Sequence, residues 1–353
     1  MIATEYYSEE ELKSLKGTFL GDEYIHDIIN EDIDIFDENG KFILSFRKNI
    51  LTKNKIGFHN YKKFVGMSRG RGLAAGPINK DSPYFKKRTL VDTKGIRTKY
   101  ITPSGNVSKM KVNNPVSSVP LGYFDKLKGP LGKDLPCRLT SYTKTKLDNF
   151  KEGLPFIQEI SYNYRDIRLE EYTKQFNRGY LKPEYMIDNT AFSTITLNRN
   201  FRTALHKDAG DYNGIACLSV LEQGKYKGGL FMIPRYGIGI NLREGDLLIA
   251  NVHEYHCNSE IFTDKEDDDY NNNMANDFSN LNKELYGEEK YSRISFVCYL
   301  RSSEPISPAT PPTISATPPI RASGGNTVPP TSAIAPPICN TLLALLAQLS
   351  PAM

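Results

Sequence analysis

The sequence predicts an α+β fold with a mainly β core of the jelly-roll type, flanked by helices. Two observations predict it: short β-rich segments follow one another in the second half of the chain, and a helical interval stands directly before them. With 353 residues, of which 39% are hydrophobic and 24% charged, the chain can bury a sizeable core. A protein that is disordered or fibrous throughout is therefore excluded.

The first third of the chain divides into two blocks of opposite charge. Residues 1–40 hold twelve acidic residues against two lysines, and residues 41–112 hold eighteen Lys or Arg against Asp81 and Asp92. Runs of charge often mark only solvated surface, and this alternative stays open for both blocks. The basic block also contains Gly-rich turns and five aromatic residues, and this mixture favours an arm that binds a polyanion. Those aromatic residues are Phe58, Tyr61, Phe64, Tyr84 and Phe85.

The helical interval runs from Lys144 to Gly179, where apolar residues recur near helical spacing and a glycine ends the pattern. Beyond it, five β-rich runs are separated by turn sequences such as DYNG, QGKYKGG and REGD. The runs are AFSTITLNRNF, IACLSVLE, GGLFMIPRYGIGINL, DLLIANVH and RISFVCYL. Several short strands with turns between them predict a β-sandwich or jelly roll, which begins at about residue 190 and ends at residue 301.

Two segments lie outside this pattern. Residues 263–290 are acidic and Asn-rich, and they are expected to be a mobile insertion between two strands. Residues 302–353 hold eleven of the 21 prolines and no lysine, which predicts a disordered tail. The end of this tail, NTLLALLAQLSPAM, leaves two alternatives, an unstructured end or a small helix that contacts a protein partner. We expect three parts: a charged N-terminal extension (1–60), a folded domain (61–301) and the Pro-rich tail (302–353).

The location of the protein is expected to be intracellular, in the nucleus or the cytoplasm. The start of the chain has no signal-peptide pattern, and no run approaches the roughly 18 apolar residues that a membrane span needs. Five widely spread cysteines without a CxxC pair fit structural thiols in a reducing compartment better than a disulfide or zinc framework.

Three of the five histidines fall between residues 206 and 256, within the β-rich half. His206 and Asp208 are two residues apart, so on a strand both side chains would point to the same face and could share a metal ion. A later histidine would complete a set of two imidazoles and one carboxylate, which suits non-haem Fe(II) with open positions for a chelating cosubstrate and O₂.

The third ligand is either His253 or His256. These residues are three apart, so on an ideal strand they face opposite ways and only one can bind the metal. The apolar residues before them do not decide between the two histidines. Some of these apolar residues share a strand face with His253 and the alternate ones share a face with His256. Taken by spacing alone, the pattern is also compatible with surface polar residues near a turn.

Arg293 and Ser295 form a second candidate site in the last β-rich run. They are expected to share one strand face with Val297 and Tyr299, while Ile294, Phe296, Cys298 and Leu300 form the other. A buried Arg needs an anion, and a dicarboxylate held by the guanidinium and by the Ser295 hydroxyl would supply it. The alternative is an edge-strand Arg that faces water.

Three runs in the catalytic half resemble the TET/JBP family of Fe(II)- and 2-oxoglutarate-dependent nucleic-acid dioxygenases, nearest its J-binding-protein-like branch. They are FSTITLNRNFRTALHKDAGDYNG, KYKGGLFMIPRYGIGINLREGDLLIANVHEYHCN and SRISFVCYL. The upstream pieces AAGPI, GYFDK and LPCRLTSY are similar to that branch too, so the resemblance covers roughly Arg69 to Arg301.

This resemblance implies a double-stranded β-helix flanked by helices, Fe(II) and 2-oxoglutarate as cofactors, O₂ as cosubstrate and DNA as partner. It implies oxidation of the methyl group of thymine or 5-methylcytosine. Position by position, it makes His206, Asp208 and His256 the catalytic metal ligands and Arg293 the 2-oxoglutarate arginine. Related oxygenases hydroxylate protein side chains, so a prolyl or lysyl hydroxylase is an alternative. A non-catalytic nucleic-acid-binding module is another.

Overall fold

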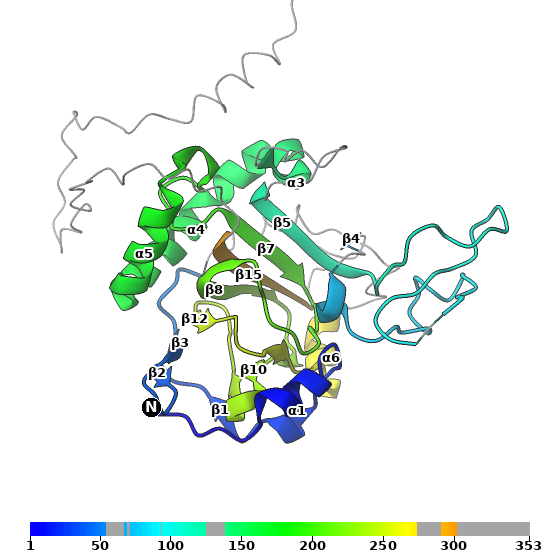
Figure 1. Cartoon of the computed structure of the whole chain (residues 1–353), viewed down its shortest axis with the longest axis horizontal. Coiled ribbons are helices and arrows are strands. Elements are labelled where there is room, and N and C mark those ends of the chain that lie inside the picture. Colours follow the sequence, from blue (N-terminus) through cyan, green and yellow to red (C-terminus); the bar gives the residue numbers. More distant parts are fainter. Residues whose placement is uncertain (54–66, 69–70, 93, 125–137, 274–290, 302–353) are drawn as a thin grey trace, which may run out of the picture.

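Two β-sheets of different size build the core of the chain (Figure 1). The computed structural model describes residues 1–53, 67–68, 71–92, 94–124, 138–273 and 291–301. The larger sheet has nine strands in the order β2-β3-β12-β8-β15-β7-β5-β4, with β6 paired to β5. Its strands are β2 (Ile33–Phe36), β3 (Phe42–Arg47), β4 (Met67–Ser68), β5 (Val116–Phe124), β6 (Arg138–Leu139), β7 (Thr194–Arg199), β8 (Asp211–Gln223), β12 (Leu247–Asn251) and β15 (Ser292–Arg301).

The smaller sheet has four strands in the order β1-β11-β10-β13. They are β1 (Asp27–Ile29), β10 (Phe231–Ile233), β11 (Ile238–Ile240) and β13 (Cys257–Asn258). A two-stranded sheet pairs β9 (Lys227–Gly228) with β14 (Ile261–Phe262). A three-residue 3-10 turn, η6 (Pro234–Tyr236), connects β10 to β11.

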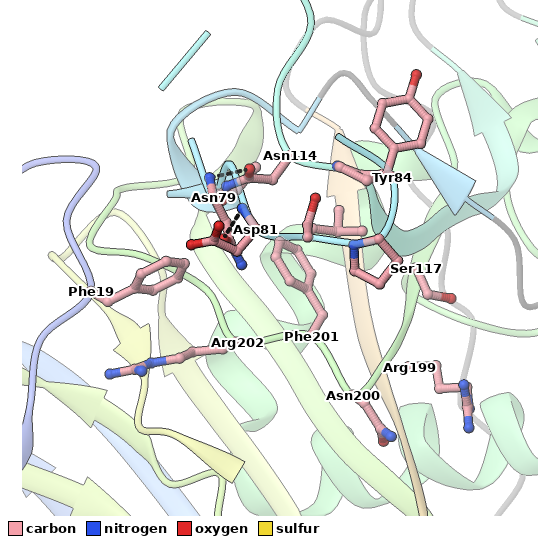
Figure 2. Close-up of a pocket in the computed structure, with 15 residues that line it drawn as sticks. Phe19, Asn79, Asp81, Tyr84, Asn114, Ser117, Arg199, Asn200, Phe201 and Arg202 are labelled. Atoms are coloured by element: carbon pink, nitrogen blue, oxygen red, sulfur yellow. Dashed lines mark hydrogen bonds between the residues drawn. The ribbon is translucent and has the colours of Figure 1, made fainter. Parts of the chain in front are cut away.

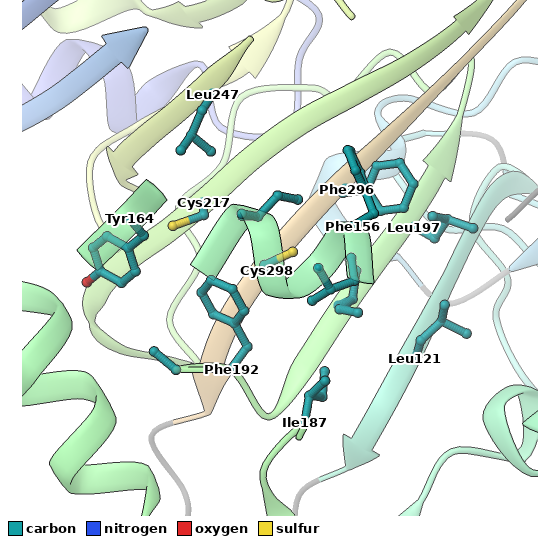
Figure 3. Close-up of a cluster of buried hydrophobic side chains, with 14 of the residues drawn as sticks. Leu121, Phe156, Tyr164, Ile187, Phe192, Leu197, Cys217, Leu247, Phe296 and Cys298 are labelled. Atoms are coloured by element: carbon teal, nitrogen blue, oxygen red, sulfur yellow. The ribbon is translucent and has the colours of Figure 1, made fainter. Parts of the chain in front are cut away.

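Three helices cover the outer face of the larger sheet: α3 (Ser141–Thr145), α4 (Leu147–Ile167) and α5 (Leu169–Gly179) (Figure 1). The predicted helical interval is confirmed and is interrupted at Arg168. Figure 3 shows the apolar cluster under α4, in which Phe156 packs edge-on against Phe296 of β15 with ring centroids 5.2 Å apart. Burial of this helix face anchors the sheet from outside.

The inner face of the larger sheet packs against the smaller sheet. On β15, Ile294, Phe296 and Cys298 join the cluster under the helices. Val297 and Tyr299 point the other way, into the cluster between the two sheets, which Phe231, Ile233, Ile238 and Ile240 of the smaller sheet share. This alternation is the expected one, and two sheets enclosing one apolar interior confirm the predicted jelly roll, here a double-stranded β-helix.

The first 53 residues do not form a separate extension. Strand β1 pairs with β11, and β3 pairs with β12, so this segment adds strands to both sheets. Charge count alone was misleading because the acidic residues alternate with apolar ones: Ile35 is fully buried, whereas the Asp34 side chain beside it is 41% exposed. The expected boundary at residue 60 lies outside the described residues.

The acidic insertion after β14 begins with a helix, α6 (Lys265–Asn272), which the composition did not predict. Asp264 caps the helix in a capping box with Asp267. The buried Asn271 side chain accepts from Lys225 N and donates to Lys225 O, so the helix is attached to the loop after β8. Residues 274–290 of the insertion and the Pro-rich tail 302–353 lie outside the described residues.

Within the described part of the chain, none of the helices has the length and apolar character needed to cross a membrane. The three described cysteines, Cys217, Cys257 and Cys298, are buried and free. Burial raises the pKa of the Cys257 thiol to about 12, so this thiol is an inert packing group at neutral pH. Cys137 and Cys339 lie outside the described residues.

Candidate metal centre and active site

His206, Asp208 and His256 come together in the structure, although they belong to two separate segments of the chain. One ligand atom from each side chain lies within 4.8 Å of the other two. The His206 Nε2 atom is 3.8 Å from Asp208 Oδ1, and the His256 Nε2 atom is 3.7 Å from Asp208 Oδ2. Both imidazoles therefore present the same nitrogen to the carboxylate, an arrangement that can hold one metal ion.

Backbone pairing places the two histidines. The His206 N–H donates to the His256 carbonyl at 3.1 Å, and the His256 N–H donates to the His206 carbonyl at 2.9 Å. The Asp208 N–H donates to the Val252 carbonyl at 3.0 Å, which fixes the carboxylate relative to the same turn. The expected placement of His206 and Asp208 on a strand was wrong, because both lie in the connection between β7 and β8.

The remaining ring nitrogen of each histidine is also held. Nδ1 of His206 lies 2.8 Å from the Ala204 carbonyl, and Nδ1 of His256 lies 2.9 Å from the Glu254 carbonyl. A carbonyl only accepts, so Nδ1 must carry the proton and Nε2 must carry the lone pair. Such a hydrogen bond to the outer nitrogen is typical of metal-binding histidines, because it fixes the tautomer and the ring direction.

Burial favours the neutral form of the His206 imidazole and leaves the Asp208 carboxylate accessible. Desolvation and the neighbouring His256 lower the pKa of His206, with a small contribution from the charge of Arg71. The His206 and His256 side chains are 13% and 7% exposed, whereas the Asp208 side chain is 41% exposed. A metal ion at this place would thus be approached from the side of Asp208.

His253 lies away from this cluster. A turn over residues 252–254 separates β12 from β13, so the run that contains both histidines is not one strand. The assumption that His253 and His256 lie on one strand was therefore wrong. The alternation of side chains along a strand could not choose between the two histidines for this reason. His253 is exposed and its backbone N–H donates to the Asn251 side chain, while His256 is buried and stacks on Phe231.

Arg293 is buried on β15, with 5% of its surface exposed, and it shares the interior face with Ser295 as expected. Among the residues that the structure describes, the Arg293 Nε atom has no hydrogen-bond partner and the Arg293 guanidinium forms no ion pair with a carboxylate. Gly229 has a φ of +66° and lies against the guanidinium: a Cβ there would stand 3.6 Å from Arg293 Nε. That distance is an ordinary van der Waals contact, so it is the left-handed backbone of this residue that favours glycine here.

A separate cavity of about 340 Å³ lies between residues 79–84, 114–117 and 199–202 (Figure 2). Its lining does not include the three candidate ligands. The Asn114 side chain on its wall is used inside the chain, since Oδ1 accepts from Asn79 N and Nδ2 donates to the carbonyls of Ala75 and Pro77. This cavity and the His–Asp–His cluster are therefore separate features of the structure.

Residues 80–92 and 94–112 of the basic block form a part that projects away from the two sheets, whereas β3 of the same block lies within the larger sheet (Figure 1). Isolated bridges such as Leu90–Tyr100 and Thr98–Val112 hold it together. Of the five aromatic residues counted in the basic block, Tyr84 and Phe85 are buried, with 3% and 1% exposed, while Phe58, Tyr61 and Phe64 lie outside the described residues. Seven cations of the projecting part are exposed: Lys80, Lys86, Lys87, Lys94, Arg97, Lys109 and Lys111.

Residues 119–302 match the family model Tet_JBP, which is described as the oxygenase domain of the 2OGFeDO superfamily. The matched range contains all three candidate ligands and Arg293. This chain is also 31% identical over 232 residues to the bifunctional helicase and thymine dioxygenase JBP2 of Trypanosoma brucei brucei. It is 31% identical over 191 residues to the thymine dioxygenase JBP1-A of Trypanosoma cruzi.

These two alignments cover 64% and 54% of this chain, but only 18% and 20% of the relatives, so the chain spans about a fifth of their length. Among solved structures, NgTET1 in complex with 5mC DNA aligns with a TM-score of 0.41 and 12% identity, over 78% of this chain and 82% of that chain. A similarity at this TM-score does not by itself establish a common fold.

Proposed function

We propose a reaction for this chain on the premise that it belongs to the Tet_JBP family, the oxygenase domain of the 2OGFeDO superfamily. The chain is an Fe(II)- and 2-oxoglutarate-dependent dioxygenase that oxidises the methyl group of thymine or 5-methylcytosine in DNA. The observation that supports this most directly is the convergence of His206, Asp208 and His256 within an oxygenase domain of this family.

The donor set fits Fe(II). Two neutral imidazoles and one carboxylate are the ligands of non-haem iron oxygenases, and both Nδ1 atoms are already engaged by carbonyls. When bound, the iron would activate O₂, with 2-oxoglutarate as the electron donor, and O₂ would be the oxidant for attack on a C–H bond, while the protein contributes binding, orientation and exclusion of water. His256 packs against Phe231 with ring centroids 5.4 Å apart, which keeps water from that side of the centre.

Arg293 and Ser295 are proposed to bind the far carboxylate of 2-oxoglutarate. Arg293 is only 5% exposed, so its unsatisfied Nε is a costly group unless an anion occupies the space in front of it. A carboxylate can accept from the guanidinium in the bidentate geometry that an Arg favours. The Ser295 hydroxyl lies on the same strand face and would donate to the same group.

DNA is the proposed partner because the methyl group to be oxidised must reach a centre whose histidines are buried. A base inside a duplex is out of reach, so the target must leave the stack, at a cost of a few kcal/mol. Contacts with the phosphate backbone can offset that cost, and the exposed cations of the projecting block provide them. Tyr84 and Phe85 do not take part in base stacking, since both are buried.

The direct test of the reaction is aerobic incubation of the full chain with Fe(II), 2-oxoglutarate and DNA that contains either thymine alone or 5-methylcytosine as well. Nucleosides released from the product are then measured by mass spectrometry. We expect hydroxymethylated pyrimidine in one of the two substrates. Peptides that contain proline or lysine are incubated in parallel, and hydroxylation of the peptides alone would contradict the proposal. Binding of DNA without any oxidation would mean that the chain is a non-catalytic binding module.

The projecting basic block should make DNA binding strongly dependent on salt. If five of its cations contact phosphates, the release of counterions gives a log–log slope of about −4.5, which corresponds to a loss of roughly 500-fold in affinity between 50 and 200 mM salt. Reversal of Lys86, Lys87, Lys94, Arg97 and Lys109 to Glu should flatten the slope in a fluorescence anisotropy titration.

The control variant reverses Lys144 and Lys151, which are exposed on the helical side of the larger sheet. It should leave the slope near that of the wild type. Decarboxylation of 2-oxoglutarate without DNA should stay near normal in both variants, which separates a loss of DNA contact from a loss of fold. A slope that the five reversals do not change would show that this block does not contact phosphates.

A further inference from the structure

The N-terminal helix α1 (Glu9–Ser14) packs against both segments that carry the candidate ligands. Leu12 of the helix is fully buried in a small cluster with Leu205, Tyr255 and Cys257. Leu205 precedes His206 directly, and the other two residues flank His256. The backbone adds to this contact, since Gly17 N donates to the Leu205 carbonyl and Leu205 N donates to the Thr18 carbonyl, both at 2.8 Å.

A salt bridge connects this helix to the residue between the first two ligands. The Lys207 ammonium lies 2.8 Å from Glu9 Oε1 and 2.9 Å from Glu9 Oε2, so both carboxylate oxygens accept from it. Lys207 also lies over the Tyr255 ring, 4.3 Å from its centroid. Its side chain, 28% exposed, is therefore held on the side of α1, away from the neighbouring Asp208 carboxylate.

Arg235 in the turn η6 extends this network to the second ligand segment. The Arg235 side chain is 11% exposed, and its guanidinium pairs with Glu5, with Glu9 and, through Nε at 3.1 Å, with Glu254. The Glu254 carboxylate accepts from Tyr255 N at 2.8 Å, and the Glu254 carbonyl is the acceptor of His256 Nδ1–H. Although burial lowers the pKa of Arg235, the carboxylates of Glu254 and Glu5 raise it above its ordinary value, so the guanidinium stays charged.

We propose that Glu9 is a positioning residue of the metal centre, which through Lys207 and Arg235 holds the two turns that present His206, Asp208 and His256. This inference rests on the metal-binding role proposed above. Glu9 touches neither metal nor substrate and acts through the residues that it pairs with. The charge of the N-terminal segment suggested a separate extension. Under this proposal, the segment is part of the site.

The expected consequence of losing the Glu9 carboxylate follows from the place of Lys207. Without that carboxylate, the Lys207 ammonium loses the partner that holds it on α1, and so does the Arg235 guanidinium, so the ligand segments beside them would be held less firmly for a metal ion. Partners outside the ligand set typically change metal affinity by about 10-fold to 100-fold when they are altered. Because the Glu9 side chain is 44% exposed, we expect an effect near the lower limit.

The test is a titration of the metal-free full chain with Co(II), followed by absorption spectroscopy, for wild type, Glu9→Gln, Lys207→Gln and the double variant. Glu9→Gln should raise the Co(II) Kd about 10-fold. The two single effects should not add in the double variant, since both act on one ion pair. The matched control is Glu170→Gln, which removes a Glu–Lys pair on the surface of α5 and should leave the Kd unchanged.

The unfolding midpoint of each metal-free variant is measured beside the titration. A Glu9→Gln variant with the midpoint of the Glu170→Gln control but weaker Co(II) binding supports positioning, because a merely structural role would change the midpoint instead. Lys207→Gln removes the Glu9–Lys207 salt bridge by changing the other partner. If the Glu9 variant does not fold, the Co(II) Kd of the Lys207 variant tests the proposal. An unchanged Kd in both single variants, or fully additive losses, would overturn the proposal. A wild-type chain without Co(II) binding would contradict the metal centre itself.

Discussion

Replacement of His206, Asp208 or His256 by Ala is expected to abolish turnover, whereas His253→Ala should retain most of it. The three residues present two Nε2 atoms and one carboxylate to a common point, and His253 is exposed outside this cluster. A bound metal ion contributes several kcal/mol to catalysis, so loss of one ligand should lower kcat by about 1,000-fold or more. The two products to measure are succinate and the oxidised nucleoside.

His253→Ala is the matched control for this series, because it removes an imidazole from the same turn without touching the cluster. Co(II) affinity, measured on the metal-free protein, should fall in the three ligand variants and stay unchanged in the control. Full activity of His256→Ala together with an inactive His253→Ala would show that the third ligand is misassigned.

The faces of β15 could be predicted from the sequence because a long strand between two neighbours has a strict period of two. Strands β7 and β8 pair with β15 on its two sides, so the strand cannot rotate. Arg293 and Ser295 consequently share the interior face, and Phe296 faces the helices, as their positions in the run require.

The same argument failed at the candidate metal ligands, although the structure does bring His206, Asp208 and His256 together. His206 pairs with His256 in an isolated bridge, and Asp208 follows in an irregular connection, so side-chain direction there is set by tertiary hydrogen bonds rather than by a local period. A turn at residues 252–254 is not marked by Gly or Pro. The choice between His253 and His256 therefore depended on family resemblance.

The N-terminal segment shows a different limit. Its acidic residues suggested a solvated extension, but their partners are far away in the sequence: Glu9 pairs with Lys207 and with Arg235. No local pattern reveals such pairs, because they arise only when β1 joins the smaller sheet and brings α1 beside the ligand segments. The sequence patterns therefore did not reveal that a network of charged residues contacts the segments that carry the candidate ligands. These residues are Glu5, Glu9, Arg235 and Glu254.

Arg293→Ala should raise the requirement for 2-oxoglutarate with little effect on metal binding. Truncation of one partner in a buried, hydrogen-bonded charge pair costs about 2 to 4 kcal/mol, which corresponds to an increase of roughly 30-fold to 1,000-fold in the half-saturating 2-oxoglutarate concentration. Arg293→Lys should restore this only in part, because an ammonium cannot form the bidentate contact. The measurement is succinate formation against 2-oxoglutarate concentration at saturating Fe(II).

The control for this prediction is Arg47→Ala, which removes an arginine of β3 paired at 2.8 Å with Asp34 of the edge strand β2. It should leave the 2-oxoglutarate requirement unchanged. Co(II) affinity of the metal-free Arg293 variant should equal that of the wild type, since the guanidinium is not a ligand; a loss there would point to a disturbed fold. If Arg293→Ala keeps the wild-type dependence on 2-oxoglutarate, the buried guanidinium does not bind the cosubstrate, and its unsatisfied Nε then requires another anion.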